Sequence, residues 1–224
     1  MQTITEVGMN HSGMDVSPTA AEMLENTELT KPKRGDEREL AKIRAEYGSE
    51  AEPVGTLPQA EGPLMLLMDK LGERLAFERT GTRLYDALMV KSKAAGNSIP
   101  QKELQHIRDE EAMHFALCGA AIQSLGGDPT EQTPCADVAG VESMGLMQVL
   151  TDPKTTLAQA LHAILVAEMT DNAAWEELIE LTMQAAPEES SDDLVARFKK
   201  AQESEIEHLE KVRGWYKAAT MDPG

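Results

Sequence analysis

Two short stretches of the sequence place an acid and an imidazole three residues apart within apolar helical patterns. Glu111 and His114 lie in "EEAMHF", and Glu205 and His208 lie in "ESEIEHLEKV". Residues three apart are neighbours on one face of a helix. In both stretches, that face otherwise carries the apolar residues that form a core. Carboxylate and neutral imidazole groups on such a face are ligands that suit iron or manganese.

Two further acids interrupt apolar stripes of their own. Glu78 lies in "LAFERTGTRLYDAL" and Glu168 in "ILVAEMTDNAAW". Four carboxylates in one core would repel one another and lose their hydration, at a cost of several kcal/mol each. Two divalent cations would match the four charges, and the two imidazoles would complete the ligand set. We therefore predict a di-metal site made by Glu78, Glu111, His114, Glu168, Glu205 and His208.

A third acid–imidazole pair of the same spacing, Glu103 and His106, lies eight residues before Glu111 and His114. Eight residues rotate a helix by roughly 80°. The face through this earlier pair also carries Glu110, which makes it polar. We interpret it as a solvated face and exclude the pair from the ligand set.

Two more residues are candidates with open alternatives. Asp171 lies one turn after Glu168 and is a further ligand, an acceptor for an imidazole N–H, or a polar gap in the stripe. Tyr85 lies two turns after Glu78 on the same face. It either serves the site, by bonding a ligand or donating an electron, or is a core tyrosine with a satisfied hydroxyl. Tyr85 is thus the one candidate catalytic residue beside the ligands.

Apolar residues recur at spacings of three and four along four segments, which predicts four long helices. The stripes run over residues 64–95, 104–125, 157–182 and 194–215, and the first passes through Leu71, Leu75, Glu78, Thr82 and Tyr85. Local signals suggest where three of these helices begin. These signals are Asn97 or Ser98 as a cap, Asp152 followed by Pro153 as a start, and Ser190 or Ser191 as a cap.

The connections between these segments are short, long and short. The long one, residues 128–154, includes "VESMGLMQVL", which has the pattern of a short helix. Two helical hairpins joined by one long crossover form an all-α, ferritin-like four-helix bundle. We place this bundle at residues 61–220, after an irregular N-terminal arm and linker at 1–60 with a short helix at 36–48.

The apolar arc of the first long helix is wider than one core contact requires. It predicts a second covered surface, supplied by a partner subunit in a homodimer or higher homo-oligomer or by the N-terminal arm.

Composition limits the classes of function. The chain has 224 residues, of which 41% are hydrophobic and only 4% aromatic, and its formal net charge is −18. Such a charge argues against nucleic-acid binding, which relies on clustered Lys and Arg. The sequence has neither an apolar run long enough for a membrane span nor the pattern of a signal peptide. Its two cysteines, Cys118 and Cys135, form no C-x-x-C motif, so we expect a cytoplasmic protein.

Over residues 64–218, the four acid-bearing segments resemble the ferritin-like di-iron carboxylate superfamily, on the side of rubrerythrins and bacterial ferritin-like proteins. The resemblance implies two iron ions, or manganese on the same ligands, that react with oxygen or peroxide. It also implies that Glu111 and Glu205 are the bridging carboxylates. No paired C-x-x-C motifs follow the bundle, so the rubredoxin-type electron-transfer module of typical rubrerythrins is missing.

These observations lead to one expected function and two alternatives. We expect oxidation of ferrous iron by peroxide or oxygen, in iron handling or oxidative-stress defence. The first alternative is oxidation of a small organic substrate, which would need an apolar cavity near Ala112, Ala167 and Ala201. The second is a non-enzymatic iron-binding protein.

Overall fold

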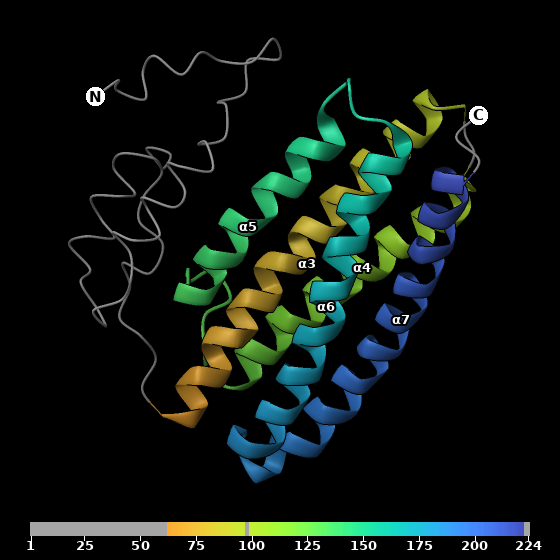
Figure 1. Cartoon of the computed structure of the whole chain (residues 1–224). Helices are drawn as coiled ribbons and strands as arrows, with labels where there is room; N and C mark the ends of the chain where they lie inside the picture. The colour runs from red at the N-terminus through yellow and green to blue at the C-terminus, as the bar shows by residue number, and fades with distance from the viewer. Residues whose placement is uncertain (1–61, 97–98, 222–224) are drawn as a thin grey trace, which may run out of the picture. The chain divides into compact units, whose positions relative to one another are not determined.

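The computed structural model describes residues 62–96 and 99–221, which form five helices and no strands. The helices are α3 (Pro63–Ala94), α4 (Gln101–Ser124), α5 (Pro134–Thr151), α6 (Leu157–Ala185) and α7 (Glu188–Met221). They run roughly along one direction (Figure 1). The predicted all-α class is therefore confirmed for this part of the chain. The predicted arm at 1–60 and its short helix at 36–48 lie outside the described residues.

The four longest helices form a closed ring of contacts. α3 packs against α4 and α6, α6 packs against α7, and α4 touches α7. The fifth helix, α5, packs against α3 and α6. One face of each long helix therefore points into a shared interior.

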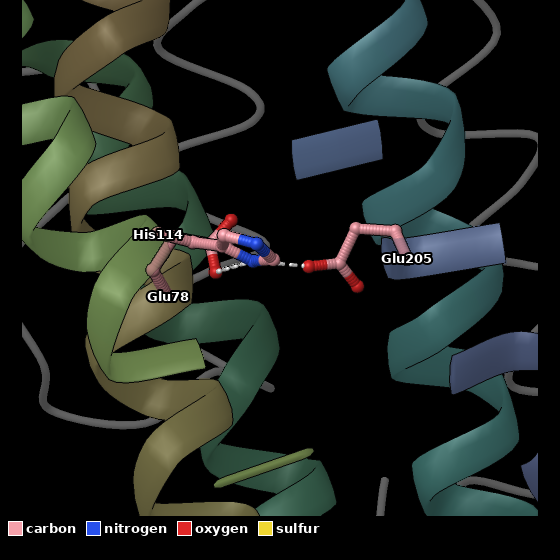
Figure 2. Close-up of side chains that lie close together, drawn as sticks. All are labelled: Glu78, His114 and Glu205. Carbon is pink, nitrogen blue, oxygen red and sulfur yellow. Dashed lines mark ion pairs between the residues drawn. The ribbon is translucent and has the colours of Figure 1, made fainter. Parts of the chain in front are cut away.

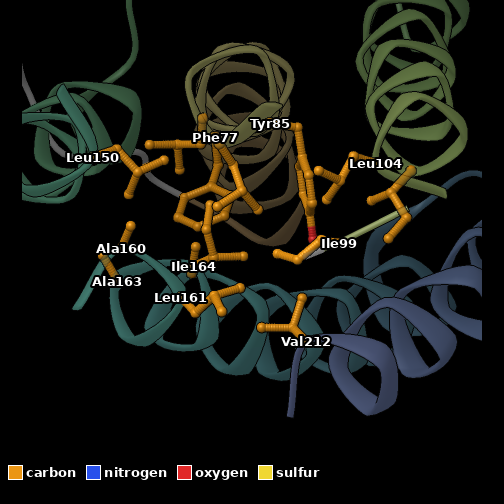
Figure 3. Packing of buried hydrophobic residues seen from close by; sticks show 14 residues of the cluster. Phe77, Tyr85, Ile99, Leu104, Leu150, Ala160, Leu161, Ala163, Ile164 and Val212 are labelled. Carbon is orange, nitrogen blue, oxygen red and sulfur yellow. The ribbon is translucent and has the colours of Figure 1, made fainter. Parts of the chain in front are cut away.

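Two apolar clusters fill this interior at different heights. One cluster, shown in Figure 3, surrounds Tyr85 and Ile164, and the other surrounds Trp175 and Phe198. Each of the four long helices contributes buried side chains to both clusters. Along α4, α6 and α7, the acids predicted as ligands lie between the residues of the two clusters, and on α3 Glu78 lies at the edge of the first cluster, next to Phe77. Water is thereby excluded from above and below the acids.

The start of α6 differs from the prediction. Asp152 and Pro153 do not begin this helix, because Asp152 terminates α5. The first residue of α6 is Leu157, and Thr156 before it forms a reciprocal capping box with Gln159. A capping box satisfies two otherwise free N–H groups of the first turn, which explains why the helix begins here.

The starts of two other helices also differ. Ser190 and Ser191 do not cap α7 but lie inside its first turn, where their hydroxyls donate to preceding carbonyls. In α4 the cap position is held by Pro100, which offers no side-chain hydrogen bond. The expected caps Asn97 and Ser98 lie outside the described residues.

The long crossover holds an 18-residue helix, α5, instead of the short helix expected at 141–150. Thr133 caps this helix by accepting a hydrogen bond from the Ala136 N–H, and its hydroxyl donates to the Asp69 carbonyl of α3. The Asp69 carboxylate in turn accepts from the Cys135 N–H at 2.8 Å. These bonds fix the start of α5 on α3.

Some apolar side chains at the start of α3 stay exposed. Leu64, Met65 and Leu66 are 38%, 55% and 43% exposed, whereas Leu84 and Leu88 of the same wide arc are buried in a cluster that α5 joins through Leu150. Within the described residues, α5 therefore covers part of the second surface that was predicted for a partner subunit or the N-terminal arm. None of the five described helices combines the length and apolar character that crossing a lipid bilayer requires.

A glycine on α3 allows the close approach of α5. A Cβ at Gly72 would lie 2.7 Å from the Thr133 Cγ2 atom. We expect Gly72→Ala to destabilise the protein by about 1–3 kcal/mol, as overpacking does, although alanine is the better helix former. Urea unfolding of the purified variant measures this change. Gly140→Ala is the matched control on α5, because nothing lies within 4 Å of its Cβ position, and it should stabilise by up to about 1 kcal/mol.

Candidate metal centre

All seven residues predicted as ligands or possible ligands lie in the interior between the two apolar clusters. None of them is more than 5% exposed. They come from all four long helices: Glu78 from α3, Glu111 and His114 from α4, Glu168 and Asp171 from α6, and Glu205 and His208 from α7.

One group of ligand atoms joins three helices. Glu78, His114 and Glu205 each place one donor atom within 4.8 Å of the others. The His114 Nδ1 atom lies 2.5 Å from Glu205 Oε1 and 3.9 Å from Glu78 Oε2. Figure 2 shows the imidazole between the two carboxylates. Two oxygens and one nitrogen thus converge on one point, as a cation requires.

A second group shares one residue with the first. It consists of Glu111, Glu205 and His208. The His208 Nδ1 atom lies 3.1 Å from Glu205 Oε2 and 3.3 Å from Glu111 Oε1. Glu205 therefore turns one oxygen toward each imidazole. A carboxylate in this position can contact two cations at once.

Gly81 makes room for the second group and was missed by the sequence reasoning. A Cβ at this position would overlap the Glu111 carboxylate. The available signal was a helix-interior glycine three residues after Glu78, at a position where glycine costs helix stability.

Glu168 is held beside the two groups. The Tyr85 hydroxyl donates a hydrogen bond to Glu168 Oε1, while Oε2 has no hydrogen-bond partner. Of the alternatives for Tyr85, the structure thus shows a buried hydroxyl bonded to a predicted ligand. Asn172 donates to the main-chain carbonyls of Glu168 and Glu205 at 3.0 and 2.9 Å, which ties α6 to α7 at the level of the site.

Asp171 pairs with a buried arginine instead of an imidazole. The Arg74 guanidinium contacts the Asp171 carboxylate and lies 3.7 Å from Glu78 Oε1. It also lies over the Phe77 ring, 4.6 Å from its centre. Arg74 is only 1% exposed. The Asp171 carboxylate can still reach Glu78, Glu111 and Glu205, because their donor atoms lie within 4.8 Å of one another.

The sequence reasoning missed Arg74 because it placed the buried stripe of α3 incorrectly. That stripe passed through Leu75 and Thr82, which are only partly buried. The buried line instead includes Leu71, Arg74 and Gly81. The sequence did contain a signal for this line, because Leu71, Arg74 and Glu78 follow one another at spacings of three and four residues.

Glu110 is a second correction. It was assigned to a solvated face, yet its side chain is only 19% exposed. Its Oε2 accepts a hydrogen bond from His208 Nε2 at 2.9 Å. This bond orients the ring so that Nδ1 faces the carboxylates. The other two residues of that face, Glu103 and His106, are exposed as predicted.

Burial raises the pKa of three of the carboxyl groups. The pKa of Glu78 and that of Glu168 are raised well above the usual value by burial and by neighbouring carboxylates. The pKa of Glu111 is raised by burial and by Glu205. These acids therefore hold protons more tightly than acids in water do.

Glu205 and His208 shift in the opposite sense. Burial alone would raise the pKa of Glu205, but the imidazoles of His114 and His208, which face this carboxylate, outweigh it and lower the pKa to about 2. Burial likewise would lower the pKa of His208, but Glu111 and Glu205 raise it to about 12. A proton on His208 thus sits against the shared carboxylate.

The remaining polar atoms fit bound cations. Both oxygens of Glu78, one each of Glu168 and Glu205, and the His114 Nδ1 atom are buried without hydrogen-bond partners. Each such atom costs about 1–3 kcal/mol unless something binds it. Arg74 and Asp171 neutralise each other, so the four glutamates would carry four negative charges once all of them are ionised. Two divalent ions match that charge, and an oxygen- and nitrogen-rich donor set suits iron or manganese.

No protein-family model, curated protein or solved structure matches this chain. The chemistry of these buried residues therefore carries the functional argument.

In the absence of metal, stability should fall as the pH rises from about 5 to about 8. Protonated Glu78 and Glu168 favour the fold because their pKa values are raised, and this contribution is lost as the pH rises through those values. The raised pKa of His208 also makes stability fall with rising pH, once the pH exceeds about 6.5, the ordinary pKa of histidine. The lowered pKa of Glu205 contributes stability that is lost only below about pH 4.5.

Urea unfolding in a chelating buffer at several pH values tests this expectation. Glu78→Gln should flatten the slope, because the amide cannot ionise, whereas the exposed Glu103→Gln should leave it unchanged. A metal-free protein that gains stability with pH over this range would contradict the burial of these acids.

Proposed function

We propose that this chain is a ferritin-like di-iron carboxylate protein that oxidises ferrous iron with hydrogen peroxide or oxygen. The observation that carries the proposal is the position of Glu205, which turns one oxygen toward each of two buried imidazoles. Each imidazole also lies near a further glutamate, Glu78 or Glu111. Two three-residue donor groups that share one carboxylate are the arrangement that two adjacent cations need.

The helix order supports a ferritin-like four-helix bundle. Short joints connect α3 to α4 and α6 to α7, and the longer connection between these hairpins contains α5. One long crossover between two hairpins distinguishes this architecture from a simple up-down-up-down bundle.

The residues of the chain have separate tasks at this centre. Glu78 and His114 would hold one iron ion, Glu111 and His208 the other, and Glu205 would contact both. When bound, each ferrous ion supplies one electron, and manganese could occupy the same ligands. Tyr85 fixes one oxygen of Glu168 and leaves the other free for a metal.

The electrons of the reaction balance without a further donor. Two ferrous ions lose two electrons, and one hydrogen peroxide takes up these electrons and two protons to give two water molecules. Iron as substrate therefore supplies the electrons itself.

Two pockets among the described residues lie away from the candidate metal centre. One pocket of about 550 Å³ is lined by residues such as Lys91, Leu150 and Thr155, and another of about 470 Å³ by His162 and Tyr216. Neither includes a residue of the metal centre.

Metal content provides the first test. The purified full chain should bind about two ferrous or manganous ions, and chelation should lower its melting temperature, because the native state binds metal and the unfolded chain binds it poorly. His114→Ala should remove about one ion per chain, as measured by titration and metal analysis. His106→Ala is the matched control from the same helix, because that side chain is 62% exposed. Loss of metal in the control but not in His114→Ala would reject the proposed ligand set.

Oxidation kinetics provide the second test. Stopped-flow mixing of the di-ferrous protein with each oxidant should show two iron atoms oxidised per peroxide consumed. Following the resemblance to rubrerythrins, we expect a faster reaction with peroxide than with oxygen. Glu205→Gln should abolish the fast phase, since it weakens both donor groups. If the di-ferrous wild-type protein reacts with neither oxidant, the proposed oxidase activity is rejected, and the alternative of a non-enzymatic iron-binding protein is favoured.

A further inference from the structure

We propose that Arg74 is a positioning residue that withholds Asp171 from the metal-ligand set and so limits that set to four carboxylates. The inference rests on the di-metal site proposed above. It assigns a task to the one buried guanidinium beside that site among the described residues.

The geometry places Arg74 where it competes with a metal for two acids. Its guanidinium contacts Asp171 of α6 and lies 3.7 Å from Glu78 Oε1 on its own helix. The same Asp171 carboxylate is within ligand reach of Glu78, Glu111 and Glu205. Asp171 therefore has two possible partners, the guanidinium or a cation held by the three glutamates.

The charge of the interior makes this competition consequential. Five carboxylates would exceed the four positive charges that two divalent ions bring. A fifth buried carboxylate without a partner would be strongly unfavourable. Arg74 supplies the missing positive charge through its contact with Asp171.

The position of the guanidinium is also fixed. Phe77 lies under it, with the ring centre 4.6 Å away. Arg74 precedes Glu78 by one helical turn, a spacing that favours an ion pair along the helix. A lysine could supply the charge here, but not the planar contact with an aromatic face.

A double-mutant cycle tests the inference through metal affinity rather than activity. The four proteins are the wild type, Arg74→Met, Asp171→Asn and the double variant, all as the full chain, titrated with Mn²⁺. Arg74→Met should bind Mn²⁺ about tenfold more tightly, because a freed carboxylate joins the ligand set. Asp171→Asn should bind about tenfold more weakly, because the unpaired guanidinium then repels the ion and pairs with Glu78. The double variant should return to within about threefold of the wild type.

Controls separate this role from a merely structural one. Arg74→Lys keeps the charge and should stay close to the wild type in Mn²⁺ affinity. Arg79→Met removes the same charge from an exposed position of the same helix and should change the affinity little. If Arg74 only supported the fold, Arg74→Met would lower stability and weaken Mn²⁺ binding. Weaker Mn²⁺ binding by a folded Arg74→Met protein would therefore overturn the inference.

The remaining outcomes are also decisive. If Arg74→Met fails to fold, Asp171→Asn and the double variant still discriminate, because the inference requires tighter binding by the double variant. Equal weak binding by these two proteins would make Asp171 a direct ligand and reject the inference. A wild type that binds two Mn²⁺ ions without this pattern rejects only the role of Arg74. A wild type that binds no Mn²⁺ rejects the di-metal site and the inference together.

Discussion

The structure depends on one electrostatic constraint: more carboxylates than cations are buried at the centre of a helical interior. Every long helix contributes at least one acid that is nearly inaccessible to solvent. Helical proteins usually fill such positions with leucine or alanine, so the acids reduce the stability of the metal-free fold unless something neutralises them. The surrounding features follow from this constraint. Apolar clusters exclude water on both sides. Hydrogen bonds from Tyr85 and Asn172, and one that Glu110 accepts from His208, hold the acids or their neighbours in place.

Without metal, the interior uses protons and one guanidinium as its positive charges. Glu205 remains ionised because two imidazoles face it, whereas Glu78 and Glu168 favour their protonated forms. Arg74 compensates Asp171 permanently. Charge is therefore balanced by groups of two kinds: protons that a metal can displace, and a guanidinium that stays. Only the acids that hold displaceable protons, together with Glu205, are free to exchange their partner for a metal ion.

The sequence predicted the ligand candidates because their signal is local. An acid and an imidazole three residues apart share a helix face whatever the rest of the fold does, and both such pairs on apolar stripes are buried. Arg74, Gly81 and Glu110 could not be assigned in this way, because their roles depend on contacts with a neighbouring helix. Gly81 matters only because Glu111 of α4 occupies the space beside it. Glu110 matters only because His208 of α7 reaches it. The start of α6 was predicted wrongly for a different reason. The capping box of Thr156 and Gln159 is visible in the sequence, but the prediction relied on Pro153 instead.

The two halves of the centre follow the same sequence plan but differ in chemistry. Each hairpin provides a glutamate on its first helix and an acid–imidazole pair on its second. Yet the outer nitrogen of His208 donates to the Glu110 carboxylate, whereas the His114 ring forms a T-shaped pair with Trp175, with 5.7 Å between the ring centres. A carboxylate behind an imidazole makes its inner nitrogen a stronger ligand, and an indole does not. Arg74 adds a positive charge 3.7 Å from Glu78, which belongs to the His114 group. If cations bind as proposed, both differences would weaken the attraction for a cation at His114 relative to His208, so the repeated plan of the sequence would give two unequal positions.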